Sequence, residues 1–299
     1  MATLRDIRRR ISAVSNTSKI TQALKMISAA KMKRAQDAIM NARPYVGKLE
    51  SMMSNLIEAV GEEYSHPLAM QKKEVHNVAA IIITSDRGMC GSFNTNIIRA
   101  SLNYIRTTLP SEYRGAKISV IPVGKKACSG YRKEKYHKLK EFPGVFTPLN
   151  FSSAKDISSI IKYGYMNGEI DRVLIFYNEF VNVIKQRPIS KVLLPIEPKA
   201  VTEKSAETSF RADYIFEPNQ SSILDELLPK LIDIQIWRTM LESNAAEQAA
   251  RMMAMDNATT NAKELIRHLE LVYNKARQAS ITKEMLEIVS GADALKKSA

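Results

Sequence analysis

The loop Ser85–Ser92 (SDRGMCGS) is the first stretch whose residue types could do chemistry. It follows an apolar run and precedes a helical pattern, where the phosphate-binding loop of a nucleotide fold would lie. Yet no Lys-Ser or Lys-Thr pair follows its second glycine, and the G-x-G-x-x-G spacing is missing. A structural turn that binds nothing is the favoured interpretation, and Gly124-Lys125-Lys126 is a weaker candidate of the same kind. We therefore expect no bound cofactor.

Cys90, inside this loop, could act as a nucleophile only beside a basic partner, usually a histidine. The chain has four histidines that share no motif with it, namely His66, His76, His137 and His268. Two cysteines, Cys90 and Cys128, are too few for a disulfide framework, and the scarcity of Cys and His argues against a metal cluster. No close pair of carboxylates offers acid–base catalysis. We expect no catalytic residue and no metal ligand, and hence a chain that is not itself an enzyme.

The net charge of +13 indicates an anionic partner: nucleic acid, a membrane surface or an acidic protein surface. Residues 1–60 carry eleven Lys/Arg and four Asp/Glu, so the excess is concentrated in the N-terminal segment. The run Arg8–Arg10 lies beside heptad positions, and no aromatic residue interleaves the charges before Tyr45, which favours a solvated or protein-facing flank over a nucleic-acid arm. No apolar run approaches the ~18–20 residues that cross a bilayer, so we expect no direct membrane insertion.

The element that dominates the sequence is C-terminal. Lys230–Ser290 contains neither glycine nor proline and, as one α-helix, would be about 90 Å long at ~1.5 Å per residue. Steps of three and four give fourteen positions, eleven of them apolar: Leu231, Ile234, Arg238, Leu241, Ala245, Gln248, Met252, Met255, Thr259, Ala262, Ile266, Leu269, Tyr273 and Ala276. This pattern predicts a coiled-coil seam rather than a buried core helix.

Near the end of this helix, apolar residues lie on more than one helical face. They are Ile281, Met285, Leu286, Ile288 and Val289. Such a tip would be an exposed apolar patch unless a partner surrounds it. We therefore expect a partner that encloses the tip.

A second long helix is predicted at the N-terminus. Thr3 and Asp6 form a capping box, apolar residues recur by threes and fours, and Gly61 is a plausible stop. A stripe in the middle of this helix comprises Ile20, Leu24 and Ile27. Pro44 removes a backbone hydrogen bond and predicts a kink. If both long helices run from one body, they lie antiparallel and pack together as a coiled coil.

Between the two helices the apolar period changes, and strands alternate with helices. Strands are expected at Val78–Thr84, Lys117–Val123, Phe142–Phe146, Arg172–Tyr177 and Val181–Ile196, and helices at Phe93–Leu109, Lys125–His137 and Ser153–Met166. This order implies βαβ units and a mostly parallel sheet covered on both faces. The predicted fold class is α/β, with a coiled-coil helix at 1–60, a central α/β domain at 75–200 and a second coiled-coil helix at 218–290.

Four stretches carry a family resemblance: DIRRRISAVSNTSKITQALKMISAAKMKRAQ (Asp6–Gln36), TSDRGMCGSFNTN (Thr84–Asn96), SNAAEQAARMMAM (Ser243–Met255) and LVYNKARQASITKEMLEIVSGA (Leu271–Ala292). They resemble the gamma subunit of bacterial F-type ATP synthases, the central stalk of that rotary motor. The resemblance covers both long helices and the core of the body. The paired terminal motifs are highly specific, whereas residues 125–220 match in layout more than in residues.

The resemblance implies an antiparallel coiled coil that stands in a hexamer of alpha and beta subunits. Its Rossmann-like body and the stalk base, with the epsilon subunit, would sit on the membrane c ring, peripheral to the cytoplasmic face of a bacterial cell membrane. Proton flow would turn the ring and the shaft, so that the shaft biases each beta subunit between conformations of differing nucleotide affinity. The family's gamma subunit performs no bond chemistry, and nucleic acid is not among the partners implied.

By motif position, the resemblance implies coupling contacts with the beta subunit at Leu24, Arg251, Gln278 and Thr282. It also implies an apolar sleeve around the tip residues and foot contacts at Tyr214 and Glu217. Two other classes remain as alternatives. A nucleic-acid-binding coiled coil would show steeply salt-dependent binding to DNA or RNA, and a nucleotide-dependent enzyme would bind its cofactor in isolation.

Overall fold

The computed structural model describes residues 3–60, 66–70, 72, 74–196 and 219–298. In chain order the elements are α1 (Leu4–Val60), β1 (Asn77–Ile83), α2 (Phe93–Asn103), a π-helical turn (Tyr104–Thr108), α3 (Leu109–Glu112), β2 (Lys117–Val123), α4 (Lys125–Gly130), β3 (His137–Lys138), α5 (Phe151–Met166), β4 (Arg172–Phe180), β5 (Gln186–Leu194) and α6 (Gln220–Ser298). They form two compact units: a coiled-coil unit, Met1–Ser28 with Met252–Ala299, and a body unit, Ala29–Arg251.

Both predicted long helices are present. α6 begins at Gln220, two residues after the predicted start at 218, and includes Pro229, while α1 continues through Pro44. The predicted capping box at the start of α1 is confirmed: the Asp6 N–H donates to Thr3 Oγ1 and the Thr3 N–H donates to Asp6 Oδ2, each over 3.2 Å. Among the described residues, every helix falls short of the apolar length that crossing a membrane requires.

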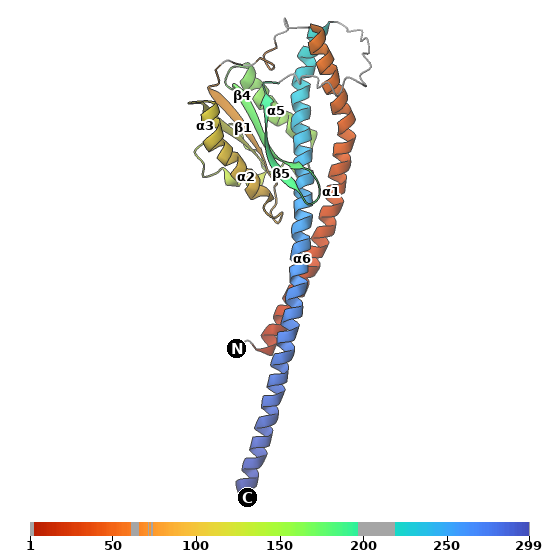
Figure 1. Ribbon diagram of the computed structural model, residues 1–299, viewed down its shortest axis with the longest axis vertical. Helices are drawn as coiled ribbons and strands as arrows, with labels where there is room; N and C mark the ends of the chain where they lie inside the picture. Colours follow the sequence, from red (N-terminus) through yellow and green to blue (C-terminus); the bar gives the residue numbers. More distant parts are fainter. Residues whose placement is uncertain (1–2, 61–65, 71, 73, 197–218, 299) are drawn as a thin grey trace. The chain divides into compact units, whose positions relative to one another are not determined.

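The body unit contains a five-stranded sheet in the order β3-β2-β1-β4-β5. β1 pairs in parallel with β2 and β4, β2 pairs in parallel with β3, and β5 pairs antiparallel with β4. In Figure 1, α2 lies on one face of this sheet and α5 on the other. The prediction of a mostly parallel α/β sheet is therefore confirmed.

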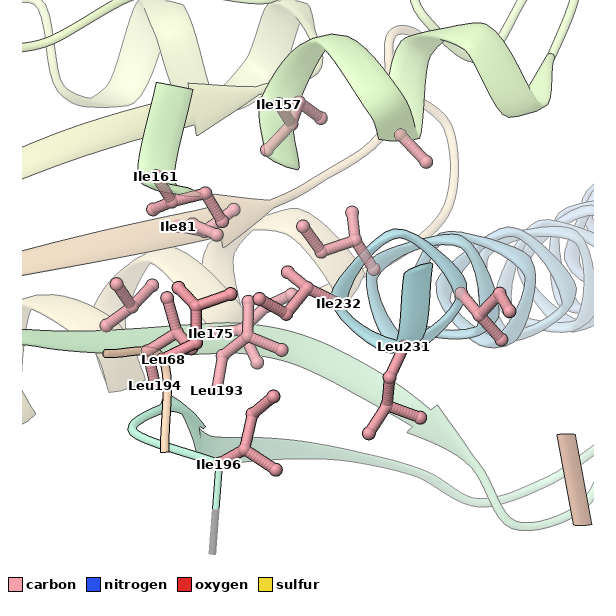
Figure 2. Packing of buried hydrophobic residues seen from close by; sticks show 14 of the residues in the cluster. Leu68, Ile81, Ile157, Ile161, Ile175, Leu193, Leu194, Ile196, Leu231 and Ile232 are labelled. Atoms are coloured by element: carbon pink, nitrogen blue, oxygen red, sulfur yellow. The ribbon is translucent and has the colours of Figure 1, made fainter. Parts of the chain in front are cut away.

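The segment Val78–Ile83 of β1 is fully buried because both faces of the sheet are covered. Its even-numbered residues pack against α2 and α4, and its odd-numbered residues pack against α5 and the body part of α6. Figure 2 shows the second core, where Ile157 of α5, Ile175 of β4 and Ile232 of α6 lie in one cluster. This double core fixes the loops at the carboxyl ends of the parallel strands.

The seam prediction is wrong for the body part of α6. Ile232, Ile236 and Met240 lie off the predicted seam and are completely buried. Figure 2 shows that the adjacent residues Leu231 and Ile232 both lie in the cluster. Here the sheet, α5 and α1 all pack on α6, so it is a core helix buried on several faces.

Two other secondary-structure predictions for the body unit are wrong. Phe142–Phe146 forms only isolated bridges because Pro143 lacks an N–H and Gly144 turns the chain with φ +81°. The predicted helix Lys125–His137 ends at Gly130, and strand β3 begins at His137. A Cβ at Gly130 would lie 2.9 Å from a side chain of α2, so α4 approaches α2 closely there.

Two further predictions hold in part. The predicted extended segment Val181–Ile196 begins with a turn, in which Asn182 Oδ1 accepts two backbone N–H groups, and only then enters β5. The predicted helix Phe93–Leu109 contains the π-helical turn Tyr104–Thr108. Pro110 follows this turn, and the wider turn relieves the clash of its ring with the carbonyl four residues earlier.

In the coiled-coil unit, α1 and α6 are antiparallel. Thr21 Oγ1 lies 2.7 Å from Thr259 Oγ1, and Lys25 Nζ lies 2.6 Å from Asp256 Oδ1. Residue numbers therefore rise along α1 where they fall along α6. The predicted α6 seam is confirmed here, because its positions from 252 to 276 are all buried or half-buried.

The middle stripe predicted on α1 is wrong. Ile20 and Ile27 are 60% and 51% exposed, whereas Ser18, Thr21 and Ser28 are buried. The seam of α1 therefore passes through small polar residues, which a search for apolar periodicity overlooks.

Candidate functional site

The loop Ser85–Ser92 follows β1, as predicted, and is held by its own carboxylate. Asp86 accepts hydrogen bonds from the backbone N–H groups of Lys125, Gly144 and Phe146 over 2.8–2.9 Å. An acidic side chain thus fills the group of amides where a bound anion would otherwise lie. The arrangement explains why a loop at this place in the sheet has a structural role.

A glycine is required at position 124, where the chain leaving β2 meets the chain leaving β1 at Thr84. The φ of Gly124 is +92°, and a Cβ there would lie 2.5 Å from the carbonyl oxygen of Thr84. The Thr84 hydroxyl accepts the backbone N–H of Ala127 over 2.7 Å, which joins the end of β1 to α4. Gly124 therefore has a structural role, and the exposed Lys125 and Lys126 begin α4.

Cys90 is 2% exposed. Burial raises the pKa of its thiol above the ordinary value, although the nearby Arg251 acts in the opposite direction. Asn94 Nδ2 donates to its sulfur over 3.1 Å and to Ser85 Oγ over 2.8 Å. A buried thiol with a raised pKa is a poor nucleophile at neutral pH.

Arg251 lies inside the body unit beside the same loop. Its Nη2 is 2.6 Å from Glu247 Oε1, and it also donates to the carbonyl oxygens of Arg87 and Gly88 over 3.4 and 3.3 Å. The side chains of Arg251 and Glu247 are only 11% and 6% exposed. Burial raises the pKa of Glu247, against the opposing effect of Arg251.

The other three residues implied as coupling contacts lie in the coiled-coil unit. Leu24 is half-buried near the seam, while Gln278 and Thr282 are exposed one turn apart on α6. The Thr282 hydroxyl donates to the backbone carbonyl of Gln278 over 2.9 Å. Gln278 and Thr282 thus lie on one exposed face of α6 within the coiled-coil unit, whereas Arg251 belongs to the body unit.

The tip of α6 extends beyond the beginning of α1 within the coiled-coil unit (Figure 1). Leu4, the first residue of α1, precedes Thr21 by as many residues as Ala276 follows Thr259, so Leu4 lies opposite Ala276. The five apolar tip residues all follow that point, and all five are exposed: Ile281, Met285, Leu286, Ile288 and Val289. Tyr214 and Glu217, the implied foot contacts, lie outside the described residues.

Sequence reasoning missed Glu247 and Asp86. The i,i+4 spacing of Glu247 and Arg251 is a readable signal for an ion pair, but its burial is not. Asp86 meets partners that follow it by 39 to 60 residues, and spacing in the sequence does not predict such contacts. Within the described part of the chain, His, Cys, Asp and Glu form no group that could hold a metal ion.

Comparison with known proteins assigns the chain to a family. A family model described as ATP synthase matches residues 3–295. The ATP synthase gamma chain of Chlorobaculum parvum is 47% identical over 296 residues, which cover 99% of this chain and 100% of that one. The ATP synthase gamma chain of Chloroherpeton thalassium is 45% identical over 305 residues and is covered completely, as is this chain.

Solved structures share the fold. A chain in the Euglena gracilis mitochondrial ATP synthase, in a structure of OSCP, F1 and c-ring, matches with a TM-score of 0.63 and 21% identity over 98% of this chain and 94% of that one. A chain from the central stalk and c-ring of the Tetrahymena thermophila mitochondrial ATP synthase matches with a TM-score of 0.56 and 24% identity, over 80% and 99%. With nearly full coverage by relatives almost half identical to it, the chain belongs to the ATP synthase gamma chain family.

Proposed function

We propose that this chain is the central-stalk rotor subunit of a proton-driven F-type ATP synthase. It couples rotation of the membrane c ring to conformational changes at catalytic sites on the beta subunits, for synthesis or hydrolysis of ATP. It carries no catalytic residue of its own. Its partners are the alpha and beta subunits of the hexamer, the epsilon subunit and the c ring, at the cytoplasmic face of a bacterial cell membrane.

The observation that carries the proposal is the overhanging end of α6. An antiparallel coiled coil that ends in a single helix, apolar on several faces, suits an axle whose end turns inside an apolar sleeve. Such a sleeve must tolerate every angle of the shaft, which apolar contacts allow because they are non-directional.

The same proposal assigns roles along the chain. Residues 1–60 and 218–290 form the axle, and residues 75–200 form the body near the c ring. Leu24, Arg251, Gln278 and Thr282 belong to the coupling region, and the exposure of Gln278 and Thr282 supports direct contact with the beta subunit. Tyr214 and Glu217 are proposed foot contacts.

The experiment is assembly of alpha and beta subunits with the full chain and with a chain that ends before Ile281. We expect the full chain to join one copy per hexamer and to raise ATPase activity, and the shortened chain to give a weaker or poorly coupled complex. A chain that neither joins nor alters the hexamer, yet binds nucleic acid with steep salt dependence, would contradict the proposal.

A further inference from the structure

Arg251 is bound within its own chain. Its guanidinium pairs with Glu247 and donates to two carbonyl oxygens of the loop Ser85–Ser92. Only 11% of its side chain is exposed, which leaves little surface for contact with another protein. A direct contact between Arg251 and the beta subunit would have to compete with these internal bonds.

Glu247 ties Arg251 to this position. A buried carboxylate without a partner is strongly disfavoured, so the 2.6 Å ion pair holds the guanidinium on α6. The same guanidinium then spans to the carbonyls of Arg87 and Gly88. The pair therefore links α6 to the loop.

The loop itself is strained at an exposed residue. Met89 has φ +62°, in the left-handed region that residues other than glycine rarely adopt, and it is 65% exposed. Such a conformation persists only where the surroundings determine it, and strained backbone is often found at functional sites. Asp86 anchors one side of the loop through three amides, and Arg251 anchors the carbonyls on the side of α6.

We propose that Arg251 is a positioning residue that acts through this loop. Together with Glu247 it holds the carbonyls of Arg87 and Gly88, so that the exposed side chains of Arg87 and Met89 face the partner in one fixed conformation. The inference rests on the proposed rotor function and refines it, because the contribution of Arg251 to coupling is indirect.

Cys90 provides a probe of the loop that is independent of coupling. It belongs to the loop and its side chain is buried, so it should react slowly with a maleimide in the isolated full-length chain. In a Cys128→Ser background, we expect Arg251→Gln to raise the labelling rate of Cys90 at least tenfold. Arg251→Lys should give an intermediate rate, and Arg267→Gln, at an exposed position of α6, should leave it unchanged.

The second readout is the number of protons pumped per ATP hydrolysed by the reassembled synthase. At equal assembly, we expect Arg251→Gln to reduce this ratio severalfold, with Arg251→Lys between it and the unmodified chain. Glu247→Gln should act in the same direction. The double variant should be no worse than Arg251→Gln alone, because both residues serve one link.

The two readouts together decide the proposal. A loss of coupling with an unchanged rate of Cys90 labelling would overturn it in favour of direct contact by Arg251. Faster labelling with intact coupling would also overturn it, because the loop conformation would then be irrelevant. Should Arg251→Gln fail to fold by circular dichroism, Arg251→Lys carries the same test. Failure of the unmodified chain to join the hexamer would instead refute the proposed function, while labelling would still report on the link.

Discussion

The buried carboxylate of Asp171 joins the amino ends of the neighbouring strands β1 and β4. It accepts the backbone N–H groups of His76 and Asn77, each over 2.8 Å, and pairs with Lys72 Nζ at 2.7 Å. Burial by itself would raise its pKa, but these hydrogen bonds outweigh burial and hold the pKa below the ordinary value of 3.8.

Replacing Asp171 by Asn should destabilise the chain by about 1–3 kcal/mol at neutral pH, because two amides and a lysine lose a charged acceptor. Since the pKa of the folded carboxyl is lowered, its stabilisation is present above pH 3.8 and is lost as the pH falls below that value. Urea unfolding at several pH values should show the difference between the two chains shrinking at acid pH. Asp156→Asn, at an exposed position, is the control. A difference that stayed constant with pH would contradict this account.

Gly124 and Gly47 should respond to alanine in opposite directions. At Gly124 the positive φ and the 2.5 Å approach to Thr84 predict a loss of about 1–3 kcal/mol. Gly47 lies within α1 with open space around it, so Gly47→Ala should gain about 0.5–1 kcal/mol. Thermal unfolding of both variants checks the pair. Equal effects would show that backbone conformation is not what distinguishes them.

For single residues, the sequence predicts contacts between near neighbours in the chain but not contacts between distant segments. The Thr3–Asp6 cap could be predicted because its partners are three residues apart. The amides bound by Asp86 and by Asp171 lie 39 to 95 residues away from them, so only the folded sheet brings them together. The i,i+4 spacing of Glu247 and Arg251 indicates an ion pair, but it does not predict the burial of that pair or its link to the loop.

At the scale of elements, the coiled-coil unit contains a polar layer. Thr21 and Thr259 bond to each other within the buried seam, and Lys25 and Asp256 pair at its edge with side chains 40% and 44% exposed. Polar groups inside a coiled coil typically fix register at a cost in stability. This layer is therefore expected to hold α1 and α6 at one axial position.

Double-mutant cycles should separate these two pairs. The Lys25–Asp256 pair, tested with Lys25→Met and Asp256→Asn, should show a coupling energy of about 0–1 kcal/mol that decreases with added salt. The Thr21–Thr259 pair, tested with valine at both positions, should show coupling that salt does not change. Chemical unfolding of the full chain at two salt concentrations measures both. A salt-sensitive threonine pair would argue against a buried hydroxyl contact.

Helices and strands were predicted correctly where the local composition is enough to determine their type. A stretch free of glycine and proline gave the long α6, and the apolar runs gave the central strands. It failed at α6 in the body, because stepping by threes and fours cannot distinguish a two-helix seam from a helix buried on several faces. It failed on α1 because the seam there passes through Ser18, Thr21 and Ser28, which have no apolar signal.

At the scale of the whole molecule, the tip of α6 should matter to assembly and not to folding. Its apolar residues are exposed in the isolated chain, so Ile281→Ser, Leu286→Ser and Ile288→Ser together should leave the body's thermal unfolding unchanged. The same triple variant should weaken retention in the hexamer severalfold, because a sleeve would lose apolar contact.

The matched control replaces three exposed charged residues of the same turns: Lys283→Ser, Glu284→Ser and Glu287→Ser. Retention is measured by gel filtration of the assembled complex. An equal loss in both triple variants would mean that the apolar character of the tip is not what holds it.

If the chain is a rotor, it must rotate relative to the hexamer of alpha and beta subunits. A Cys at the exposed position 133 (Lys133→Cys, with Cys128→Ser) carries a visible probe, while the alpha and beta subunits are fixed to a surface. We expect ATP-driven rotation of the probe in one direction, which stops when ATP is removed. Steady ATP hydrolysis with a probe that never rotates would contradict it.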